Sequence, residues 1–386
     1  MPALDVHHAR TARAQRRFRR RYRIPIICLA LSGAFVLASC SSSKDSGSGA
    51  TRGASDSAPS SSATSTANEP TLTVAIGSNG LNYAPFFVAL AKNLFVKNGV
   101  KVDVQSANAV ATIQTLLVSN QIDLGLTSPS QILVLAAAGK PINIVSNVNN
   151  YTGRSAAFVT SSKITSFDQL KAKGGSCTIT TTAAGTVLYA YAKRTVQAYG
   201  LKCAIATVAS NPLVLSAITA GLTDAVTLTV NDAQTATAKG AQALLDPTMM
   251  TDAQSNSIVP SPLPAIVVAG LPETLKSKSA AVVSFLAAMR EATKFIESNP
   301  PAVSANLIVS QPYFNGLTVD QLTASIQALL TSFPTGSDLG QISQGTWEQT
   351  LTTFASYFDL PGFDPTATAV QYAAMVDMTY LEKIPK

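Results

Sequence analysis

The chain has 386 residues and a formal net charge of +7, and charged residues make up only 13% of it. Eight of its 28 basic residues but only one of its 21 acidic residues lie in residues 1–39, so the remainder carries 20 of each and no net charge. Nucleic-acid-binding proteins need an excess of basic residues to neutralise phosphates, so this composition argues against that class of protein.

Both histidines, His7 and His8, lie in the same first segment. If that segment is removed, the mature protein has no imidazole. Ser-His-Asp catalysis, Cys-His catalysis and every metal site with histidine ligands are then excluded. We therefore predict a protein that is not an enzyme, with no catalytic residue, no metal site and no cofactor.

Residues 1–39 have the pattern of an export signal. Basic residues up to position 23 precede an apolar run, residues 24–38, which is shorter than the about 20 residues that a membrane span needs. The run ends in Leu37-Ala38-Ser39-Cys40, which resembles the lipobox of bacterial lipoproteins. The resemblance implies cleavage before Cys40 and a lipid on its thiol. The protein would then be anchored on the outer face of the cytoplasmic membrane or on the periplasmic side of the envelope.

Residues 40–70 are predicted to be the lipidated cysteine and a disordered linker. Residues 41–68 consist mostly of Ser, Thr, Ala and Gly and contain almost no large apolar side chain that could form a core. A flexible tether of this length spans roughly 30 Å. It would hold a folded domain near a membrane without fixing its orientation.

Residues 71–151 alternate between strand and helix patterns, which predicts a parallel sheet with helices on its faces. We assign them to the first part of lobe one. Strands are expected at residues 72–77, 100–105, 124–126 and 142–148, and helices at residues 84–97, 109–119 and 129–138.

Residues 152–270 repeat the alternation and are assigned to lobe two. The polar residues 147–154 are a candidate crossover, and Ala265–Val268 is the strand expected to return to lobe one. Residues 271–386 are assigned to the return to lobe one and to C-terminal helices. Lobe-two strands are expected at residues 156–160, 177–181, 202–208 and 225–228, and C-terminal helices at residues 279–297, 301–309, 318–330, 345–358 and 366–379.

One local pattern occurs twice, 101 residues apart. In each copy a helix ends, an aspartate follows, a short apolar strand comes next, and a polar loop opens another helix. The aspartates are Asp123 and Asp224, and we expect them to cap or brace turns. Two copies at matched positions indicate two α/β lobes of similar build that face each other across a cleft.

Four cysteines are present, of which Cys28 lies in the signal and Cys40 would carry the lipid. The remaining two, Cys177 and Cys203, each open a predicted strand of lobe two. Neighbouring parallel strands lie about 4.8 Å apart, so a disulfide is possible where the register agrees. An exported protein meets oxidising conditions. We predict a disulfide worth roughly 3 kcal/mol, and the alternative is two buried free thiols.

Candidate ligand contacts are the polar residues that follow the strands, because ligands of open parallel sheets bind outside the carboxyl ends of the strands. The segment 181–186 (TTAAGT) precedes a helix and favours an anion, whereas Asp232 favours a cationic or hydroxyl-bearing ligand. The same residues could instead cap helices. The candidates in lobe one are Asn79, Asn82, Tyr83, Thr127, Ser128, Asn149 and Tyr151. The candidates in lobe two are Thr181, Thr182, Gly185, Thr186, Asn211, Asn231 and Asp232.

Several segments between about residues 71 and 310 resemble one protein family in their order and spacing. Residues 82–99 (NYAPFFVALAKNLFVKNG), 116–125 and 217–226 resemble segments of the substrate-binding proteins of ABC importers for nitrate, sulfonate, taurine and thiamine precursors. The family fold is α/β, a type II periplasmic binding protein with two lobes, each a mainly parallel sheet flanked by helices. After Asp224 the chain lacks the family's usual aromatic residue and Pro-Tyr pair. The identity of the ligand therefore cannot be inferred from the family.

The resemblance implies an extracytoplasmic solute-binding lipoprotein. It would capture a sulfonate, nitrate, pyrimidine or similar small molecule by hinge closure and deliver it to an ABC permease and its ATPase, as a monomer. One alternative is a sensory or scaffolding lipoprotein of the cell envelope without a transport role. A weaker alternative is an enzyme that makes a pyrimidine precursor. It is weaker because such relatives use a histidine, and the mature chain has none.

Overall fold

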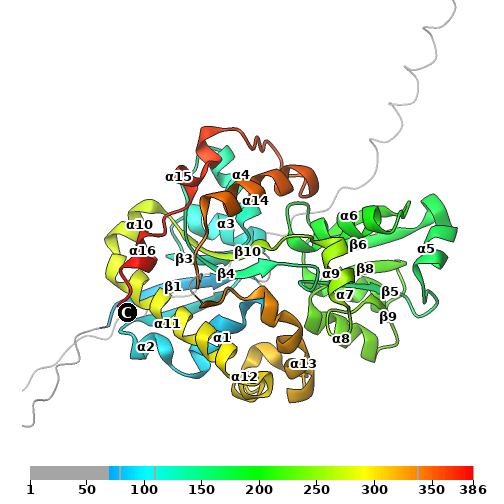
Figure 1. Ribbon diagram of the computed structural model, residues 1–386, viewed down its shortest axis with the longest axis horizontal. Helices are drawn as coiled ribbons and strands as arrows, with labels where there is room; N and C mark the ends of the chain where they lie inside the picture. The colour runs from blue at the N-terminus through cyan, green and yellow to red at the C-terminus, as the bar shows by residue number, and fades with distance from the viewer. Residues whose placement is uncertain (1–68, 78–79, 108–109, 337–338, 386) are drawn as a thin grey trace, which may run out of the picture. The chain divides into compact units, whose positions relative to one another are not determined.

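A computed structural model describes residues 69–77, 80–107, 110–336 and 339–385, which contain two five-stranded β-sheets flanked by helices (Figure 1). The predicted signal peptide, Cys40, the linker up to residue 68 and the candidate contact Asn79 lie outside the described residues. No helix among the described residues is both long and apolar enough to cross a membrane.

The first sheet has the strand order β2-β1-β3-β10-β4. Strands β1, β2 and β3 pair in parallel, and β10 pairs antiparallel with both β3 and β4, so four strands run one way and β10 runs the other. The strands are β1 (Thr71–Ile76), β2 (Lys101–Ser106), β3 (Leu124–Thr127), β4 (Asn143–Tyr151) and β10 (Leu263–Gly270).

The second sheet repeats this arrangement with the order β7-β6-β8-β5-β9, in which only β5 runs against the others. The chain enters this sheet by β5 and returns to the first sheet by β10. Each entering strand starts at the edge where its neighbours end, so it must run antiparallel to them. The strands are β5 (Ala157–Thr160), β6 (Thr178–Thr182), β7 (Ala204–Val208), β8 (Ala225–Leu228) and β9 (Gln242–Leu245).

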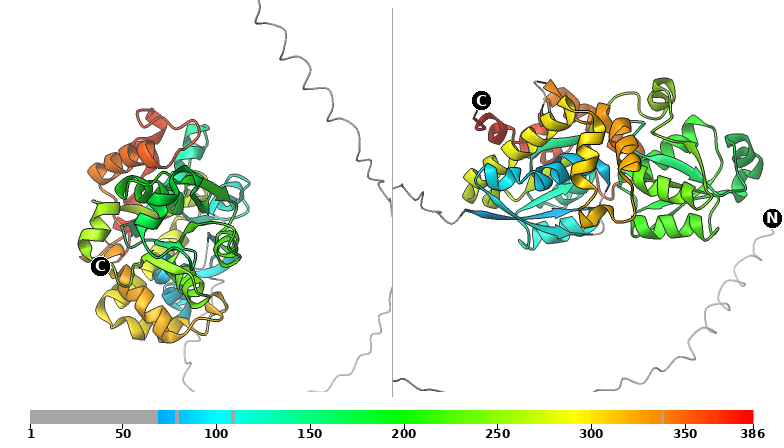
Figure 2. Two further views of the ribbon diagram at one scale, coloured as in Figure 1. Left: turned by 90° about the vertical axis from the view of Figure 1, so that its right-hand side faces the viewer. Right: turned by 90° about the horizontal axis from the view of Figure 1, so that it is seen from below.

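Helices cover each sheet, and the second sheet with its helices lies beside the first lobe (green in Figure 2). The first lobe carries α1 (Ala84–Ala91), α2 (Leu94–Lys97), α3 (Val110–Val118), α4 (Pro129–Ala137), α10 (Pro272–Ser277), α11 (Ser279–Ser298), α12 (Pro301–Ile308), α13 (Val319–Leu329), α14 (Gln344–Tyr357), α15 (Tyr372–Met375) and α16 (Thr379–Glu382). The second lobe carries α5 (Phe167–Lys173), α6 (Val187–Ala198), α7 (Asn211–Thr219), α8 (Val230–Ala238) and α9 (Asp252–Ile258).

The predicted fold class, two α/β lobes with mainly parallel sheets, is confirmed. The strand expected at Ala265–Val268 is part of β10, which pairs with β3 and β4 of the first sheet. Local patterns explain many helix boundaries. For example, Thr318 and Gln321 form the capping box that starts α13.

Several predicted elements differ from the structure. The helix expected over 84–97 is two helices, because Asn93 adopts a left-handed backbone conformation with a φ of 52° that asparagine tolerates. The helix expected over 366–379 is wrong, since this stretch contains only short helical pieces, among them α15. Strand β9 and helix α9 were not predicted, because QALL and DAQSNSI lack strong strand or helix periodicity.

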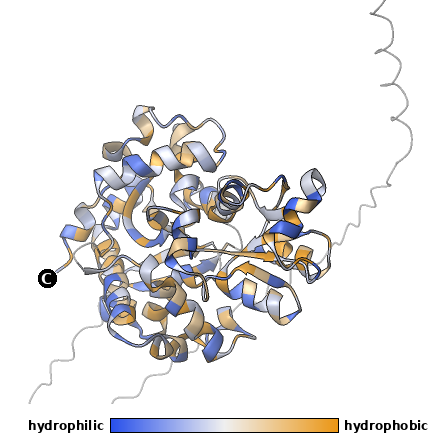
Figure 3. Ribbon diagram, turned by 45° about the vertical axis from the view of Figure 1, so that its right-hand side comes forward, coloured by the Kyte–Doolittle hydropathy of each residue, from blue (hydrophilic) through white to orange (hydrophobic). Residues whose placement is uncertain are grey.

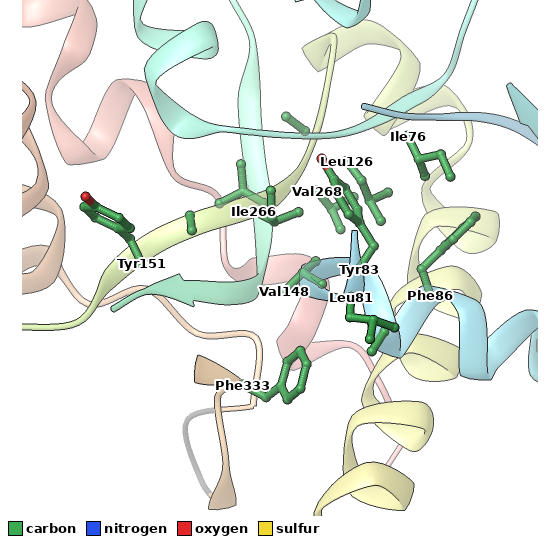
Figure 4. Close-up of a cluster of buried hydrophobic side chains, with 14 of the residues drawn as sticks. Ile76, Leu81, Tyr83, Phe86, Leu126, Val148, Tyr151, Ile266, Val268 and Phe333 are labelled. Atoms are coloured by element: carbon green, nitrogen blue, oxygen red, sulfur yellow. The ribbon is translucent and has the colours of Figure 1, made fainter. Parts of the chain in front are cut away.

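The core of the first lobe forms around β10, which lies between β3 and β4 and is buried along all eight residues. A strand that is covered on both faces reads as a continuous apolar run, as β10 does (LPAIVVAG), and orange segments run through the interior of the fold in Figure 3. Figure 4 shows Leu126 and Val268 from this sheet with Tyr83 and Phe86 from the segment after β1. The candidate contact Tyr83 is therefore a core residue that is only 2% exposed.

The predicted disulfide is confirmed between Cys177 and Cys203, whose Cα atoms are 4.4 Å apart. The two cysteines immediately precede Thr178 and Ala204, which are register partners in the parallel pair β6–β7. The bond therefore ties together the amino ends of neighbouring strands.

Asp123 and Asp224 have the same structural role in the two sheets. The Asp123 carboxylate accepts a hydrogen bond of 2.9 Å from the Thr73 backbone N–H at the start of β1, and the Asp224 carboxylate accepts one of 3.0 Å from Thr178 at the start of β6. Each also pairs with a lysine, Lys278 at 2.7 Å and Lys173 at 3.3 Å. The interpretation that these aspartates brace turns is confirmed.

Candidate functional site

The carboxyl ends of the parallel strands in the first sheet bring several of the predicted polar residues to one edge. Thr127 is the last residue of β3, and Ser128 is the N-cap of α4. Asn149 and Tyr151 lie on β4 and not in the loop that the sequence predicted, because β4 continues to pair with β10 as far as Leu263. Asn82 lies in a short 3-10 turn, Leu81–Tyr83, which follows β1.

Three of these side chains are fully buried with polar atoms that have no hydrogen-bond partner in the described part of the chain. They are the Thr127 hydroxyl, both amide atoms of Asn149 and the Tyr151 hydroxyl. A buried polar group without a partner costs about 1–3 kcal/mol, so such groups are rare unless something else satisfies them. Ser128, by contrast, forms a hydrogen bond of 2.7 Å with the Ser130 hydroxyl.

Burial raises the pKa of Tyr151 far above its ordinary value, although the nearby charge of Arg194 acts in the opposite direction. The Tyr151 phenol therefore stays protonated at any physiological pH. It can donate one hydrogen bond and accept another.

The corresponding edge of the second sheet is different, because its threonine hydroxyls bond to one another. The hydroxyls of Thr181 and Thr227 are 2.6 Å apart, and so are those of Thr182 and Thr186. Thr186 also caps α6 by accepting a hydrogen bond of 3.2 Å from the Tyr189 backbone N–H. These side chains have their partners within the protein.

The segment that opens α8 is also internally bonded. Thr229 is its N-cap, and its hydroxyl lies 3.1 Å from Asn231 Oδ1 and 2.7 Å from Asp232 Oδ2. Burial raises the pKa of Asp232, and the hydrogen bond from Thr229 counteracts this only in part. Asn211 opens α7 after the edge strand β7, so β6 separates it from the β8 edge and it does not join this group.

Gly185 connects the two lobes through both of its peptide groups. Its N–H donates a hydrogen bond of 2.7 Å to the Phe358 carbonyl, and its carbonyl accepts hydrogen bonds from the Ser130 hydroxyl and, at 3.1 Å, from Gln131 Nε2. Gly185 has a φ of +83°, and an added Cβ would lie 2.9 Å from Leu360 Cδ2. The Gly185 N–H predicted to face an anion is used within the protein.

Residues 357–360, here called the C-terminal strap, hold the first turns of α6. The Asp359 carboxylate accepts hydrogen bonds from the Tyr189 hydroxyl at 2.5 Å and from Lys193 Nζ at 2.6 Å. The Arg194 guanidinium lies 4.0 Å from the centre of the Tyr357 ring. One face of α6 therefore rests on the strap.

These contacts shift two pKa values in opposite directions. The hydrogen bonds from Lys193 and Tyr189 lower the pKa of Asp359. Burial, together with the hydrogen bond to Asp359, raises the pKa of Tyr189 to about 12.

A second contact between the lobes is made by α8 and α13. Gln234 Nε2 donates a hydrogen bond of 3.2 Å to the Gln321 carbonyl. The first crossover also packs on α9, since Gly153 leaves no room for a Cβ beside Ser255 of that helix. These contacts join the two lobes.

Arg154, a basic residue at the end of the predicted crossover, is fully engaged within the protein. It donates to the Pro247 carbonyl at 2.9 Å and pairs with Asp252 at 3.0 Å. Sequence reasoning missed Arg194, whose Nε is buried without a partner and whose Nη1 donates to the Ile258 carbonyl at 2.8 Å. Its spacing of three residues from Tyr191, on the buried face of α6, was the available signal.

Comparison with known proteins identifies the family. A family model described as "NMT1/THI5 like" matches residues 81–303, which is more than half of the chain. The protein belongs to this family. No curated protein matches the chain.

The NMT1/THI5-like chain shares its fold with several solved structures. The alkanesulfonate-binding protein SsuA from Xanthomonas axonopodis pv. citri, bound to MOPS, is 17% identical with a TM-score of 0.63 over 81% of this chain and 99% of that one. The nitrate-binding protein NrtA from Synechocystis is 13% identical with a TM-score of 0.64 over 82% and 88%. A zinc-bound ligand-binding component of an ABC-type import system from Staphylococcus aureus is 12% identical with a TM-score of 0.64 over 82% and 99%.

At these identities the likeness shows the fold of the NMT1/THI5-like chain alone. The type II periplasmic binding protein fold implied by the sequence resemblance is thereby confirmed. Among the described residues, no three His, Cys, Asp or Glu side chains gather closely enough to hold a metal ion.

Proposed function

We propose that the protein is an extracytoplasmic solute-binding lipoprotein that captures a small molecule between its two lobes and delivers it to an ABC importer. Membership of the NMT1/THI5-like family and the fold shared with SsuA and NrtA support the proposal. The ligand contacts would come from the predicted residues at the strand ends. Thr127, Asn149 and Tyr151 would be the principal ones.

The observation that carries the proposal is the group of buried polar atoms without partners on Thr127, Asn149 and Tyr151. Hydrogen-bonding capacity that is buried and unused costs stability, so it persists where a ligand uses it. The group lies at the carboxyl-end edge of the first sheet, which is where open α/β sheets bind ligands. The paired threonine hydroxyls of the second sheet would form the opposite wall of the binding site and define its shape.

The mechanism we propose is hinge closure around the two crossovers. A ligand binds the first lobe and gains further contacts when the second lobe closes on it. The strap and the α8–α13 contact would then hold the closed form, which is the form an importer recognises. Because each of these contacts is small, opening stays accessible for release.

A thermal-shift screen of residues 71–386 against sulfonates, nitrate, pyrimidines, flavins and amino acids tests the binding function. A ligand at about 100 times its Kd would stabilise the protein by about 2.7 kcal/mol, which is an easily measured shift. If no small molecule raises the melting temperature, the second candidate, a sensory or scaffolding envelope lipoprotein, is favoured.

We further propose the organisation that the sequence predicts. Residues 1–39 form a signal peptide, residues 40–70 a lipidated cysteine and tether, residues 71–151 and 271–386 lobe one, and residues 152–270 lobe two. The anchor is tested by labelling cells with an alkyne fatty acid. Wild-type protein should be labelled and sediment with membranes, and Cys40→Ala should be unlabelled. Label on the Cys40→Ala variant would contradict the proposed lipidation site.

A further inference from the structure

We propose that the ligand is uncharged and presents a hydrogen-bond donor beside an acceptor. The Asn149 side chain would recognise this donor–acceptor pair by hydrogen bonding to both groups. This inference rests on the proposed solute-binding function and names its substrate class. Carboxamides, lactams and the edges of nucleobases all carry such a donor–acceptor pair.

Asn149 is the centre of the inference because neither end of its amide is used. Its side chain is fully buried on β4, and both Oδ1 and Nδ2 lack a partner in the described part of the chain. An asparagine amide offers one acceptor and two donor hydrogens in a plane. Its best complement is a planar group with the opposite order of donor and acceptor, and such a bidentate pair is worth about 1–3 kcal/mol.

Two other unused groups at the same edge of the sheet are also neutral. The Thr127 hydroxyl and the protonated Tyr151 hydroxyl can each donate and accept, and neither carries a charge. Like the Asn149 amide, they have no net charge to offer. A charged ligand buried against such a set would lose its hydration without gaining an opposite charge.

The charged residues near the strand ends are largely engaged elsewhere. Lys193 pairs with Asp359 and Arg154 pairs with Asp252, so neither cation is available to an anion. At the start of α6, the Gly185 N–H is bonded to Phe358. One backbone N–H of the anion site that the sequence suggested at residues 181–186 is therefore already used within the protein.

Two charged groups could still argue for a charged ligand. Arg194 keeps an unused Nε, but its guanidinium stacks on Tyr357 and donates to Ile258, which ties it to the strap and to α9. Asp232 accepts from Thr229. The test therefore includes variants of both residues.

A stability comparison without ligand is the first test. If Asn149 and Thr127 are kept polar for a ligand, then Asn149→Leu and Thr127→Val should raise the melting temperature of the free protein, by about 2 °C each. Thr181→Val is the matched control, because Thr181 is equally buried but its hydroxyl is paired with Thr227. That variant should melt at a lower temperature. If Asn149→Leu melts lower as well, the amide is structural and the inference fails, while the solute-binding function stands.

Matched probes of one shape and different charge are the second test. Benzamide, benzoate and benzamidinium, and methanesulfonamide with methanesulfonate, are compared by thermal shift and calorimetry. The amides should bind, and Asn149→Leu should weaken their binding by about 10- to 100-fold, whereas Arg194→Gln and Asp232→Asn should weaken it far less. Binding of the acids that Arg194→Gln abolishes, or of benzamidinium that Asp232→Asn abolishes, would overturn the inference and still support solute binding.

Discussion

At the scale of single residues, Gly185 shows how a position predicted to bind ligand is also a structural contact. Its backbone has a φ of +83°, and its two peptide groups are hydrogen-bonded to Phe358, Ser130 and Gln131 of the first lobe. A left-handed backbone favours glycine, and the close approach of Leu360 removes the space for a side chain.

Gly185→Ala should therefore weaken closure as well as stability. We expect a loss of about 1–2 kcal/mol from backbone strain and crowding together, measured by urea unfolding. Gly200→Ala is the control, because Gly200 has a φ of +61° but an added Cβ there meets nothing within 4 Å. Equal losses in the two variants would mean that the contact with Leu360 is unimportant.

Asp359 makes the stability of the contact between the strap and α6 depend on pH. Its pKa is lowered in the folded protein by Lys193 and Tyr189, so its contribution to stability is present above its unfolded pKa of about 3.9 and is lost as pH falls through its lower folded value. The carboxylate is half-exposed, so the contribution is small, about 0.2–1 kcal/mol.

We therefore predict that Asp359→Asn lowers stability slightly at pH 7 and has a smaller effect at pH 2, which lies below the unfolded pKa of about 3.9. Chemical unfolding at the two pH values measures this difference. Asp364→Asn is a useful comparison, because Asp364 bonds only to Thr366 within its own turn. A difference between wild type and Asp359→Asn that persists unchanged at pH 2 would contradict the ion-pair explanation.

At the scale of the elements, the repeated aspartates fix the starts of the central strands. Asp123 accepts a backbone N–H of β1 and Asp224 one of β6, and each pairs with a lysine. Both lie at the opposite end of the sheet from the polar residues of the candidate site. The repeated sequence pattern therefore reflects a requirement of folding and not of ligand binding.

Asp123→Ala and Asp224→Ala should each destabilise the protein by about 1–3 kcal/mol, because a backbone N–H loses its acceptor and a lysine loses its partner. Affinity for a ligand should not change. Asn at either position keeps an acceptor oxygen and should cost less. A change in affinity without a change in stability would assign these aspartates to the binding site instead.

The disulfide is a second feature that stabilises the arrangement of the strands. It closes a loop with a sequence separation of 26 that contains β6 and α6, for which the chain-entropy estimate is roughly 3 kcal/mol. We expect the Cys177→Ala/Cys203→Ala double variant to lose about that amount in chemical unfolding. Mass spectrometry of unreduced wild-type protein should show no free thiol in residues 71–386, and two free thiols would refute the bond.

At the scale of the whole folded part, three contacts hold the lobes together in addition to the crossovers. The strap contacts α6, α4 contacts Gly185, and α13 contacts α8. The contacts of Asp359 and of Gln234 share no residues, so their energies should be nearly additive.

Asp359→Asn combined with Gln234→Ala should therefore shift the ligand-free protein further toward an open form than either change alone. Small-angle scattering should show a larger radius of gyration for the double variant, and a saturating ligand should restore the wild-type value. If the double variant scatters as the wild type does, the crossovers and the contact of Gly185 with α4 are enough to determine the lobe arrangement.

The sequence by itself determined the two α/β lobes, the disulfide partners and the bracing role of Asp123 and Asp224. These depend on local periodicity and on residues close to a strand end. It also identified Thr127 and Asn149 as candidates, because polar residues near strand ends are visible in the chain. It missed the break at Asn93, which depends on the left-handed backbone of one residue. It also missed the strand β9 and the true end of β4, because pairing with a distant strand overrides local preference.

Only the tertiary structure decided which polar groups have hydrogen-bond partners and which have none in the described part of the chain. Thr181 and Thr127 look alike in the sequence, yet Thr181 has Thr227 as a partner and Thr127 has none in the described part of the chain. In the same way Gly185 is bonded to residues 54 to 173 positions away, which no local pattern encodes. A hydrogen bond depends on the distance between two groups in space, and for groups far apart in the chain only the folded arrangement determines that distance.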